Sequence, residues 1–195
     1  KYFSEHTDEL DGNIIMIAEC DEEDNSKGII TQGLVMIDSL SYVDDRMITS
    51  WKGTYDNIHD NQVEWYKAKH DAIESEYGKF SSVNILHIPP YQTEKEYDEN
   101  DFLYGEKREG VCESGFDAGL FDAMKEKGSA QAVYFGHDHV NDFGVMYENI
   151  LLSYIQPSGY GVYNMESKFD SPENEWIQGA TLLKINSDGT YSAER

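Results

Sequence analysis

The segment that decides the fold is Ala132-Val133-Tyr134-Phe135-Gly136-His137-Asp138-His139. Its first four residues are apolar or aromatic, which is typical of a short buried strand. Gly136 then lets the backbone turn sharply. Two imidazoles that lie two positions apart at the end of a buried strand can point into one crevice, on a rigid platform for ligands. A His-x-His pair alone is weak evidence and often only a polar turn, but the strand and the glycine favour a ligand role.

A second buried strand is predicted over residues 83–88, where the sequence is apolar and β-branched. Pro89 and Pro90 follow it and prevent regular structure from continuing. A helix is predicted between this strand and the strand 132–135. A strand, helix, strand connection makes the two strands neighbours, so His87 is expected to open on the same edge as the His137–His139 pair.

Two amphipathic helices are expected. The first is capped by Asp60 or Asn61 and ends near Gly78, and apolar or aromatic residues and one histidine recur along it at steps of three and four. These residues are Val63, Tyr66, His70, Ile73 and Tyr77. The second helix ends at Gly128, with basic residues in its last turn. Its apolar positions are Phe116, Leu120, Ala123 and Met124.

The rest of the chain is predicted to be rich in β-structure. Residues 13–19 and 33–38 are expected to form a hairpin, and further strands are expected near 144–147, 150–154 and 180–186, followed by a short last strand. This order of elements predicts a mixed α/β domain with helices packed on a sheet. The length of 195 residues corresponds to one domain, residues 1–195, with little room for a second core.

The candidate metal ligands are His87, His137 and His139. Neutral imidazole is the commonest protein ligand for zinc, manganese or iron. Taken alone, His87 could equally be a strand-end residue that binds a backbone carbonyl. Asp138 and Asn141 are candidate positioning or substrate-orienting groups, although Asp138 could face solvent and Asn141 could serve as a turn residue.

The other histidines are expected to have structural roles. His70 lies on an apolar helix stripe and is interpreted as a hydrogen-bonded core residue. His59 precedes a helix and is interpreted as a solvated turn residue, and His6 lies near a chain end. The acidic run 19–24 lacks the spacing of a calcium loop and is interpreted as a solvated turn.

The charge of the chain disfavours two classes of partner. The 15 basic and 38 acidic residues give a formal net charge of −23. Such a surface repels phosphate backbones and anionic lipids, so no nucleic-acid or membrane partner is expected. No apolar stretch approaches the ~20 residues that span a bilayer. Cys20 and Cys112 allow one disulfide or two free thiols, so they leave the localisation open.

A family resemblance accounts for several of these segments. The residues 133–143 and the upstream Leu86-His87-Ile88-Pro89 resemble the calcineurin-like metallophosphoesterases, and within them the purple acid phosphatase-related branch. Residues 55–66, 109–116 and 158–161 agree with it in the same order. The resemblance implies a sandwich of two sheets flanked by helices, of which this chain is the C-terminal portion. It also implies a two-metal centre that hydrolyses phosphate esters.

The resemblance implies a ligand set that is incomplete in this chain. His87 and His137 would share one ion, and His139 would hold its neighbour, each ion being iron, manganese or zinc. The family's Asp-x-His, Gly-Asp and Gly-Asn-His motifs do not occur in the sequence. The chain is therefore expected to lack the N-terminal half of the domain with its bridging carboxylate. Alone, it is expected to be inactive and to self-associate through sheet surface left exposed.

A non-catalytic, secreted module that binds a carbohydrate or another small ligand is the alternative function. Its support is an aromatic content of 13%, with 14 tyrosines and 3 tryptophans that could stack on sugars. Tyr66 and Tyr77 fit a helix stripe, however, and Tyr134 fits a buried strand. Core packing therefore explains several of these aromatic residues.

Overall fold

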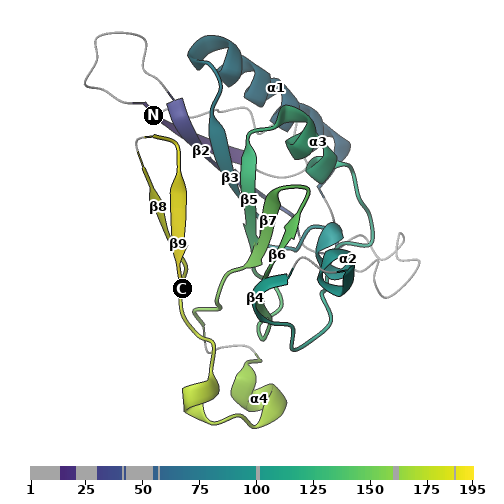
Figure 1. Cartoon of the computed structure of the whole chain (residues 1–195). Helices are drawn as coiled ribbons and strands as arrows, with labels where there is room; N and C mark the ends of the chain where they lie inside the picture. The colour runs from purple at the N-terminus through teal and green to yellow at the C-terminus, as the bar shows by residue number, and fades with distance from the viewer. Residues whose placement is uncertain are drawn as a thin grey trace.

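The computed structural model describes residues 14–20, 30–40, 42, 55–56, 58–99, 102–159, 163–186 and 188–195. Seven strands form one mixed sheet in the order β1-β2-β3-β5-β7-β6-β4 (Figure 1). Their bounds are β1 (Ile14–Cys20), β2 (Ile30–Ile37), β3 (Ser81–Ile85), β4 (Phe102–Glu106), β5 (Ala130–Phe135), β6 (Asp142–Tyr147) and β7 (Ile150–Tyr154). A second, two-stranded sheet joins β8 (Leu182–Ile185) and β9 (Tyr191–Glu194).

The centre of the large sheet is parallel. Strands β2, β3, β5 and β7 run in the same direction, while β1, β6 and β4 add antiparallel pairs. Because β3 and β5 pair directly, their carboxyl ends open at the same edge of the sheet. The predicted neighbourhood of these two strands is confirmed, as is the predicted hairpin of β1 and β2.

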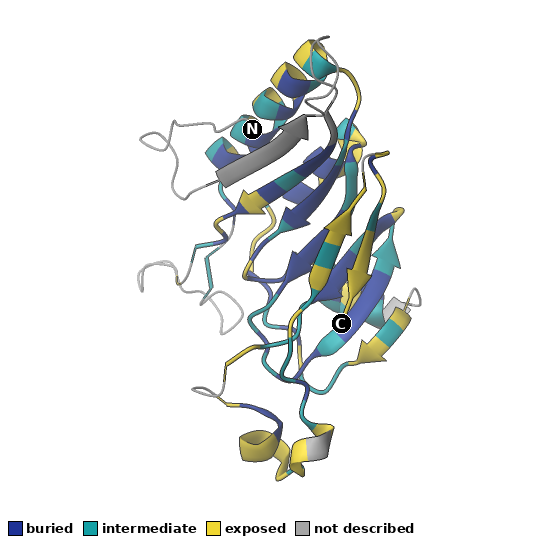
Figure 2. Cartoon of the chain, turned by 90° about the vertical axis from the view of Figure 1, so that its left-hand side faces the viewer, coloured by how far each residue is buried: buried dark blue, intermediate teal, exposed yellow. Residues whose placement is uncertain are grey.

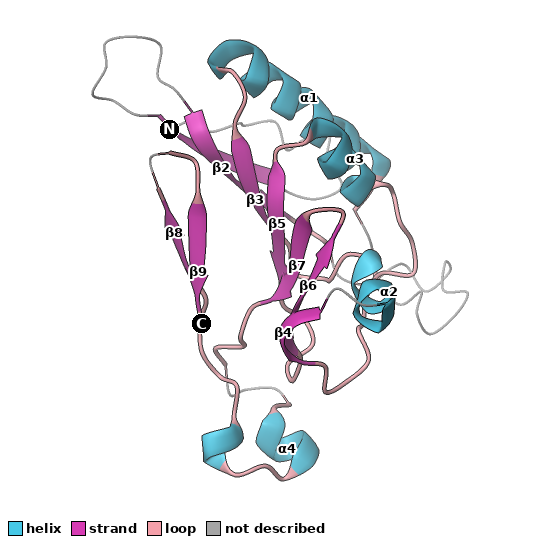
Figure 3. Cartoon of the chain, in the orientation of Figure 1, coloured by secondary structure: helices cyan, strands magenta, loops and turns pink. Residues whose placement is uncertain are grey.

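Helices cover one face of the large sheet, and the β8–β9 hairpin lies on the opposite side (Figures 1 and 3). The covering helices are α1 (Asp60–Tyr77), α2 (Gln92–Glu99) and α3 (Leu120–Lys127), while α4 (Met165–Phe169) and a 3₁₀ turn at Glu173–Glu175 lie beyond the end of the sheet, at the bottom of Figure 1. The main core lies between the sheet and α1 and α3, and includes Val35, Tyr66, Met124 and Val133. A smaller cluster of Val83, Ala132 and Tyr134 packs against Leu183 and Tyr191 of the hairpin. The predicted mixed α/β fold with two sheets is confirmed.

Burial follows these layers (Figure 2). The central strand β5 ends in four consecutive buried residues, Ala132 to Phe135. This pattern is expected of a parallel strand covered on both faces, whose sequence is a continuous apolar run. The strand therefore forms a rigid base for the turn that follows it.

Three predicted boundaries differ from the structure. His59, not Asp60 or Asn61, is the residue that caps α1, and its N–H donates to Gln62 Oε1 at 2.9 Å. Helix α3 begins at Leu120 rather than near Phe116, because Gly119 before it has a left-handed φ of 82°. Strand β3 ends at Ile85, since the N–H groups of His87 and Ile88 both donate to Ser39 Oγ rather than to a strand.

The polar stretch 92–110 contains a helix and a strand, α2 and β4, which the sequence does not predict. Parts of the predicted hairpin turn, the acidic run 19–24 and the region of His6 lie outside the described residues. Among the helices that the structure describes, none has both the length and the apolar character needed to cross a membrane.

Candidate metal centre

His87 and His137 meet where β3 and β5 end. The two loops leave the sheet side by side, because Leu86 N–H donates to the Tyr134 carbonyl at 2.9 Å and Gly136 N–H donates to the His87 carbonyl at 3.1 Å. As a result His137 Nδ1 lies 3.3 Å from His87 Nε2, and the rings are nearly perpendicular. Two ligands of a tetrahedral zinc ion lie roughly 3.4 Å apart, given bonds of about 2.1 Å. The separation therefore suits one shared ion, although it is also within hydrogen-bond reach.

The His137 backbone has a conformation that is uncommon for a residue with a side chain. Its φ is 79°, in the left-handed region. Such positions cost free energy and persist where surrounding contacts fix them. Here the Asp138 N–H donates to the Gly136 carbonyl at 3.1 Å. The Tyr55 ring packs edge-on against the His137 imidazole, with ring centroids 4.5 Å apart, so contacts on both sides hold this residue in place.

His137 is held neutral. Burial lowers the pKa of its imidazole to about 4, and the nearby charges of His87 and His139 lower this pKa further, against a small opposing effect of Glu109. A neutral imidazole keeps a lone pair on one ring nitrogen, which a metal ligand needs.

His139 is oriented by Tyr163. Its Nδ1–H donates to the Tyr163 carbonyl at 3.1 Å. The two rings are stacked, with centroids 4.7 Å apart and an angle of 11° between their planes. Because a carbonyl oxygen only accepts, the proton lies on Nδ1 and the free lone pair on Nε2. The Tyr163 hydroxyl accepts from the His139 N–H at 3.2 Å and donates to Glu109 at 2.8 Å. Glu109 in turn pairs with Lys168 of α4.

Asp138 faces the interior rather than solvent, with 3% of its surface exposed. Its Oδ2 accepts from the Tyr154 hydroxyl at 2.5 Å and from the Cys112 N–H at 3.0 Å. Burial raises the pKa of Asp138, and these hydrogen bonds oppose the rise. The Asp138 carboxylate thus links the turn that follows β5, residues 136–139, called the histidine turn, to β7 and to the loop before α3. It positions the histidines of this turn.

Asn141 fastens a neighbouring loop. It is fully buried, and its Oδ1 accepts from the N–H groups of Arg108 and Glu109 at 2.9 and 3.0 Å. This contact fixes the segment that carries Glu109. Asn141 therefore acts indirectly, through the loop that supports Tyr163 and His139.

Cys112 is a free thiol beside the turn. Burial and the neighbouring Asp138 carboxylate raise the pKa of the thiol to about 12. It therefore stays protonated at neutral pH and is a poor metal ligand and nucleophile. The side chain of Cys20 lies outside the described part of the structure.

The remaining histidines lie away from this edge. His59 Nε2 pairs with Asp56 at 2.9 Å, so it is a helix-capping residue with a carboxylate partner rather than a purely solvated one. His70 is 2% exposed, which confirms its predicted burial, but neither ring nitrogen has a hydrogen-bond partner. The prediction that its hydrogen bonds are satisfied is therefore wrong.

The edge of the sheet that carries His87, His137 and His139 is called the histidine edge below. Among the described residues, this edge has no complete set of metal ligands. In the described part of the chain, one group of three potential ligands has donor atoms within 4.8 Å of one another: His70, Asp71 and Glu74 on α1, away from this edge. No carboxylate joins His87 and His137 at that distance. The described residues at this edge could therefore supply only part of the ligand set of a metal ion.

The chain resembles three proteins of Arabidopsis thaliana in sequence, while no protein-family profile matches it. It is 27% identical to "Probable inactive purple acid phosphatase 14" over 138 residues, which are 67% of this chain and 33% of that protein. It is 28% identical to "Probable inactive purple acid phosphatase 28" over 155 residues, 72% of this chain and 38% of that protein. With "Probable inactive purple acid phosphatase 29" it shares 27% identity over 117 residues, 56% of this chain and 30% of that protein.

This chain is related to the purple acid phosphatases. The relationship covers part of their domain, because the chain spans about a third of the length of the curated relatives that it matches. The predicted resemblance to a metallophosphoesterase family is thereby confirmed. The family is one of phosphatases, but the names of these three relatives describe them as probably inactive.

Sequence reasoning missed Tyr154 and Tyr163. Both act on the site from 16 to 24 residues away, the first through its hydroxyl and the second largely through its backbone carbonyl. A carbonyl partner leaves no signal in residue identity. Glu109, by contrast, lies in the segment 109–116 that carries the family resemblance and could have been found from it.

Proposed function

We propose that His87, His137 and His139 are the histidine ligands of a two-metal phosphoesterase centre, with carboxylate ligands supplied by a segment outside this chain. The observation that carries the proposal is the 3.3 Å approach of His87 Nε2 and His137 Nδ1 at the carboxyl edge of β3 and β5. The relationship to the purple acid phosphatases supports the same chemistry.

The donor set fits borderline metals. Imidazole nitrogens suit iron, manganese or zinc, and hard cations such as calcium prefer all-oxygen sites. His87 and His137 would share one ion, and His139, with its Nε2 lone pair free, would hold the second. Two such ions supply Lewis-acid activation of water and neutralise charge on a phosphoryl group.

The residues of the chain itself would orient these ligands. Tyr163 fixes the ring and tautomer of His139, and Asp138 fixes the turn that carries His137 and His139. Local cationic charge would also be needed to attract a phosphate ester, because the chain as a whole carries a charge of −23. Asp138 and Asn141 contact backbone N–H groups, so we assign them to positioning.

The proposed partners are a phosphate ester and an N-terminal half of the same domain, with no nucleic acid and no membrane. Coverage of only about a third of each relative supports the missing segment. Self-association of the isolated chain is expected at the β4 edge, where Phe102 is 46% and Leu103 52% exposed. Light scattering of a Leu103→Lys variant at high concentration tests it, since a charge on an edge strand blocks pairing.

A second candidate function is metal or phosphate-ester binding without turnover. The names of the three relatives, each a probable inactive phosphatase, favour it. The carbohydrate-binding alternative has less support, because Tyr66 and Tyr134 are 0% and 2% exposed and cannot present a stacking face.

The test is hydrolysis of an aryl phosphate with added manganese, zinc or iron. The 195-residue chain is compared with any longer product of its gene, each as purified and as the His139→Ala variant. We expect turnover only in the longer protein and its loss in the variant. Equal turnover by the short chain would contradict the half-site, and metal binding without turnover by the longer protein would favour the second candidate.

A further inference from the structure

The side of α1 near the start of β3 carries a second group of potential ligands. The His70 ring packs on Phe80, the residue that precedes β3, with ring centroids 4.9 Å apart. His87 follows the other end of the same strand, so this group is separate from the histidine edge. His70 is 2% exposed, and neither Nδ1 nor Nε2 has a hydrogen-bond partner. A buried polar group left without a partner is costly and requires an explanation.

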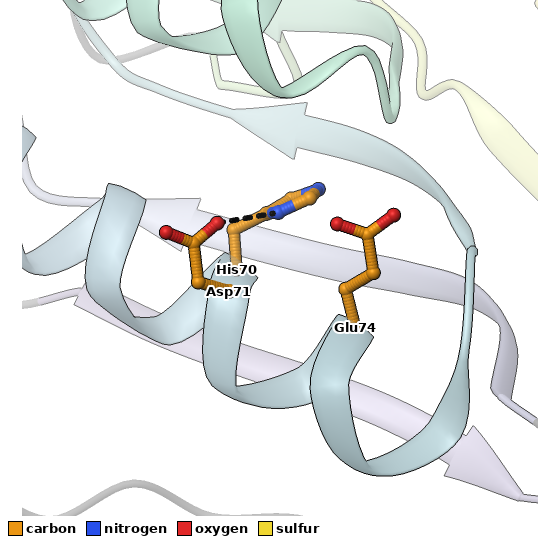
Figure 4. A group of neighbouring side chains, drawn as sticks. All are labelled: His70, Asp71 and Glu74. Atoms are coloured by element: carbon orange, nitrogen blue, oxygen red, sulfur yellow. Dashed lines mark ion pairs between the residues drawn. The ribbon is translucent and has the colours of Figure 1, made fainter.

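Two carboxylates stand beside this imidazole. Figure 4 shows the His70 ring between the carboxylates of Asp71 and Glu74. Glu74 is four residues further along the helix and shares its face with His70. His70 Nδ1 lies 3.6 Å from Asp71 Oδ1, too far for a hydrogen bond, and one donor atom of each residue lies within 4.8 Å of the other two.

We propose that His70, Asp71 and Glu74 bind one divalent transition-metal ion of the zinc class. Ligand atoms on a tetrahedral zinc are roughly 3.4 Å apart, so small rotations of the two carboxylate side chains would close the group around an ion. One imidazole and two carboxylates leave a fourth position for water. The nitrogen donor favours zinc, cobalt or manganese over calcium or magnesium.

The electrostatics of the group suit a cation. Burial lowers the pKa of His70, against smaller opposing effects of Glu74 and Asp71, so the imidazole keeps a lone pair at neutral pH. The exposed Asp71 and the half-buried Glu74 bring negative charge to a dication at the protein surface. An ion here would satisfy one of the two ring nitrogens of His70 that have no hydrogen-bond partner.

Lys127 of α3 competes for this group. Its ammonium nitrogen lies 2.7 and 2.8 Å from the two oxygens of Asp71. A fixed cation beside a bound dication repels it, so the lysine weakens the site. Removing the ammonium in Lys127→Met should therefore tighten binding of the metal. The same substitution removes an ion pair between α1 and α3, so it should lower the folding stability slightly while it raises the metal affinity.

The test is titration of the whole chain with zinc chloride, followed by calorimetry, and with cobalt chloride, followed by visible absorption. Wild type is compared with His70→Gln, Glu74→Gln and Lys127→Met. Glu76→Gln is the matched control, because Glu76 is an exposed residue on the same helix outside the group. His87, His137 and His139 are unchanged throughout, so any zinc held there is common to every titration.

We expect His70→Gln and Glu74→Gln each to weaken one zinc ion by more than about tenfold and to remove its cobalt absorption. Glu76→Gln should bind zinc with the affinity of wild type, and Lys127→Met should bind zinc at least about threefold more tightly than wild type. Circular dichroism checks folding. If His70→Gln fails to fold, Glu74→Gln decides the matter. Unchanged zinc binding by a folded Glu74→Gln protein would overturn the proposal.

Discussion

Histidines near the two ends of β3 are in opposite situations. At its carboxyl end His139 is held by a backbone carbonyl and a stacked tyrosine, and His137 meets His87 at 3.3 Å. At its amino end His70 is buried with no hydrogen bond, beside two carboxylates. The His137 and His139 side chains are already held by contacts within the protein. The ligands proposed at the amino end would need side-chain rotations to surround an ion.

The supports of the two ends differ as well. The carboxyl end is fastened by the buried Asp138, which joins the histidine turn to Tyr154 and Cys112. The amino end is bounded by exposed ion pairs between α1 and α3, such as Lys67 with Glu126 at 2.7 Å. Buried hydrogen bonds to a charged group contribute more than exposed ion pairs, so the two ends should respond differently to substitution.

The largest expected effect is that of His139→Ala on metal at the histidine edge. Loss of an oriented imidazole should weaken its ion by more than the ~100-fold upper range of changes to supporting residues. Glu76→Gln, at an exposed position of α1 outside both groups of candidate ligands, is the control and should leave that ion in place. Elemental analysis of the longer protein after dialysis at neutral pH measures both. Full occupancy in His139→Ala would remove the distinction between the two ends.

Asp138→Ala should give the largest change in folding stability. It leaves the Tyr154 hydroxyl and the Cys112 N–H without their acceptor, and Tyr154 is fully buried. We expect a loss of about 2–4 kcal/mol in the free energy of unfolding. Urea denaturation measures it. Asp122→Ala, an exposed aspartate in the first turn of α3, should stay within about 0.5 kcal/mol of wild type.

The meeting of β3 and β5 could be predicted from the sequence, because two apolar runs joined by a helix leave few alternatives. Helix α2 could not, since its buried Thr93 and Glu96 are polar and give no apolar period. Strand β4 has mostly exposed residues and no alternation. The burial of His70 follows from its helix stripe, but whether its nitrogens find partners depends on side-chain rotations that sequence periodicity does not carry.

The acid side of the stability profile should reflect His137 in metal-free protein. The folded pKa is about 4, lowered by burial and by His87 and His139 against Glu109, while the unfolded value is 6.5. Between these values the unfolded chain binds a proton that the folded chain does not, so stability falls as the pH drops from 6.5 towards 4. With solvent screening, roughly 1–2 kcal/mol is expected.

Urea denaturation in the presence of a chelator, at several pH values, measures this slope. The comparison is with His137→Asn, because asparagine tolerates the left-handed backbone at this position. His70 changes stability in the same direction in both proteins, since burial lowers its pKa too. The difference between the two slopes therefore isolates His137, and identical slopes would show that its environment is not the buried one described.

The smallest expected effect is that of the exposed ion pair at the other end of β3. Lys67→Ala and Glu126→Ala each remove one partner of a contact between side chains that are 39% and 58% exposed. Solvent screens such pairs, so a double-mutant cycle should give a coupling of about 0.2–1 kcal/mol that shrinks in high salt. A coupling as large as the Asp138→Ala effect would mean that α1 and α3 are held by this ion pair. In that case the amino end would be as firmly fixed as the histidine edge, and the contrast between the two ends would fail.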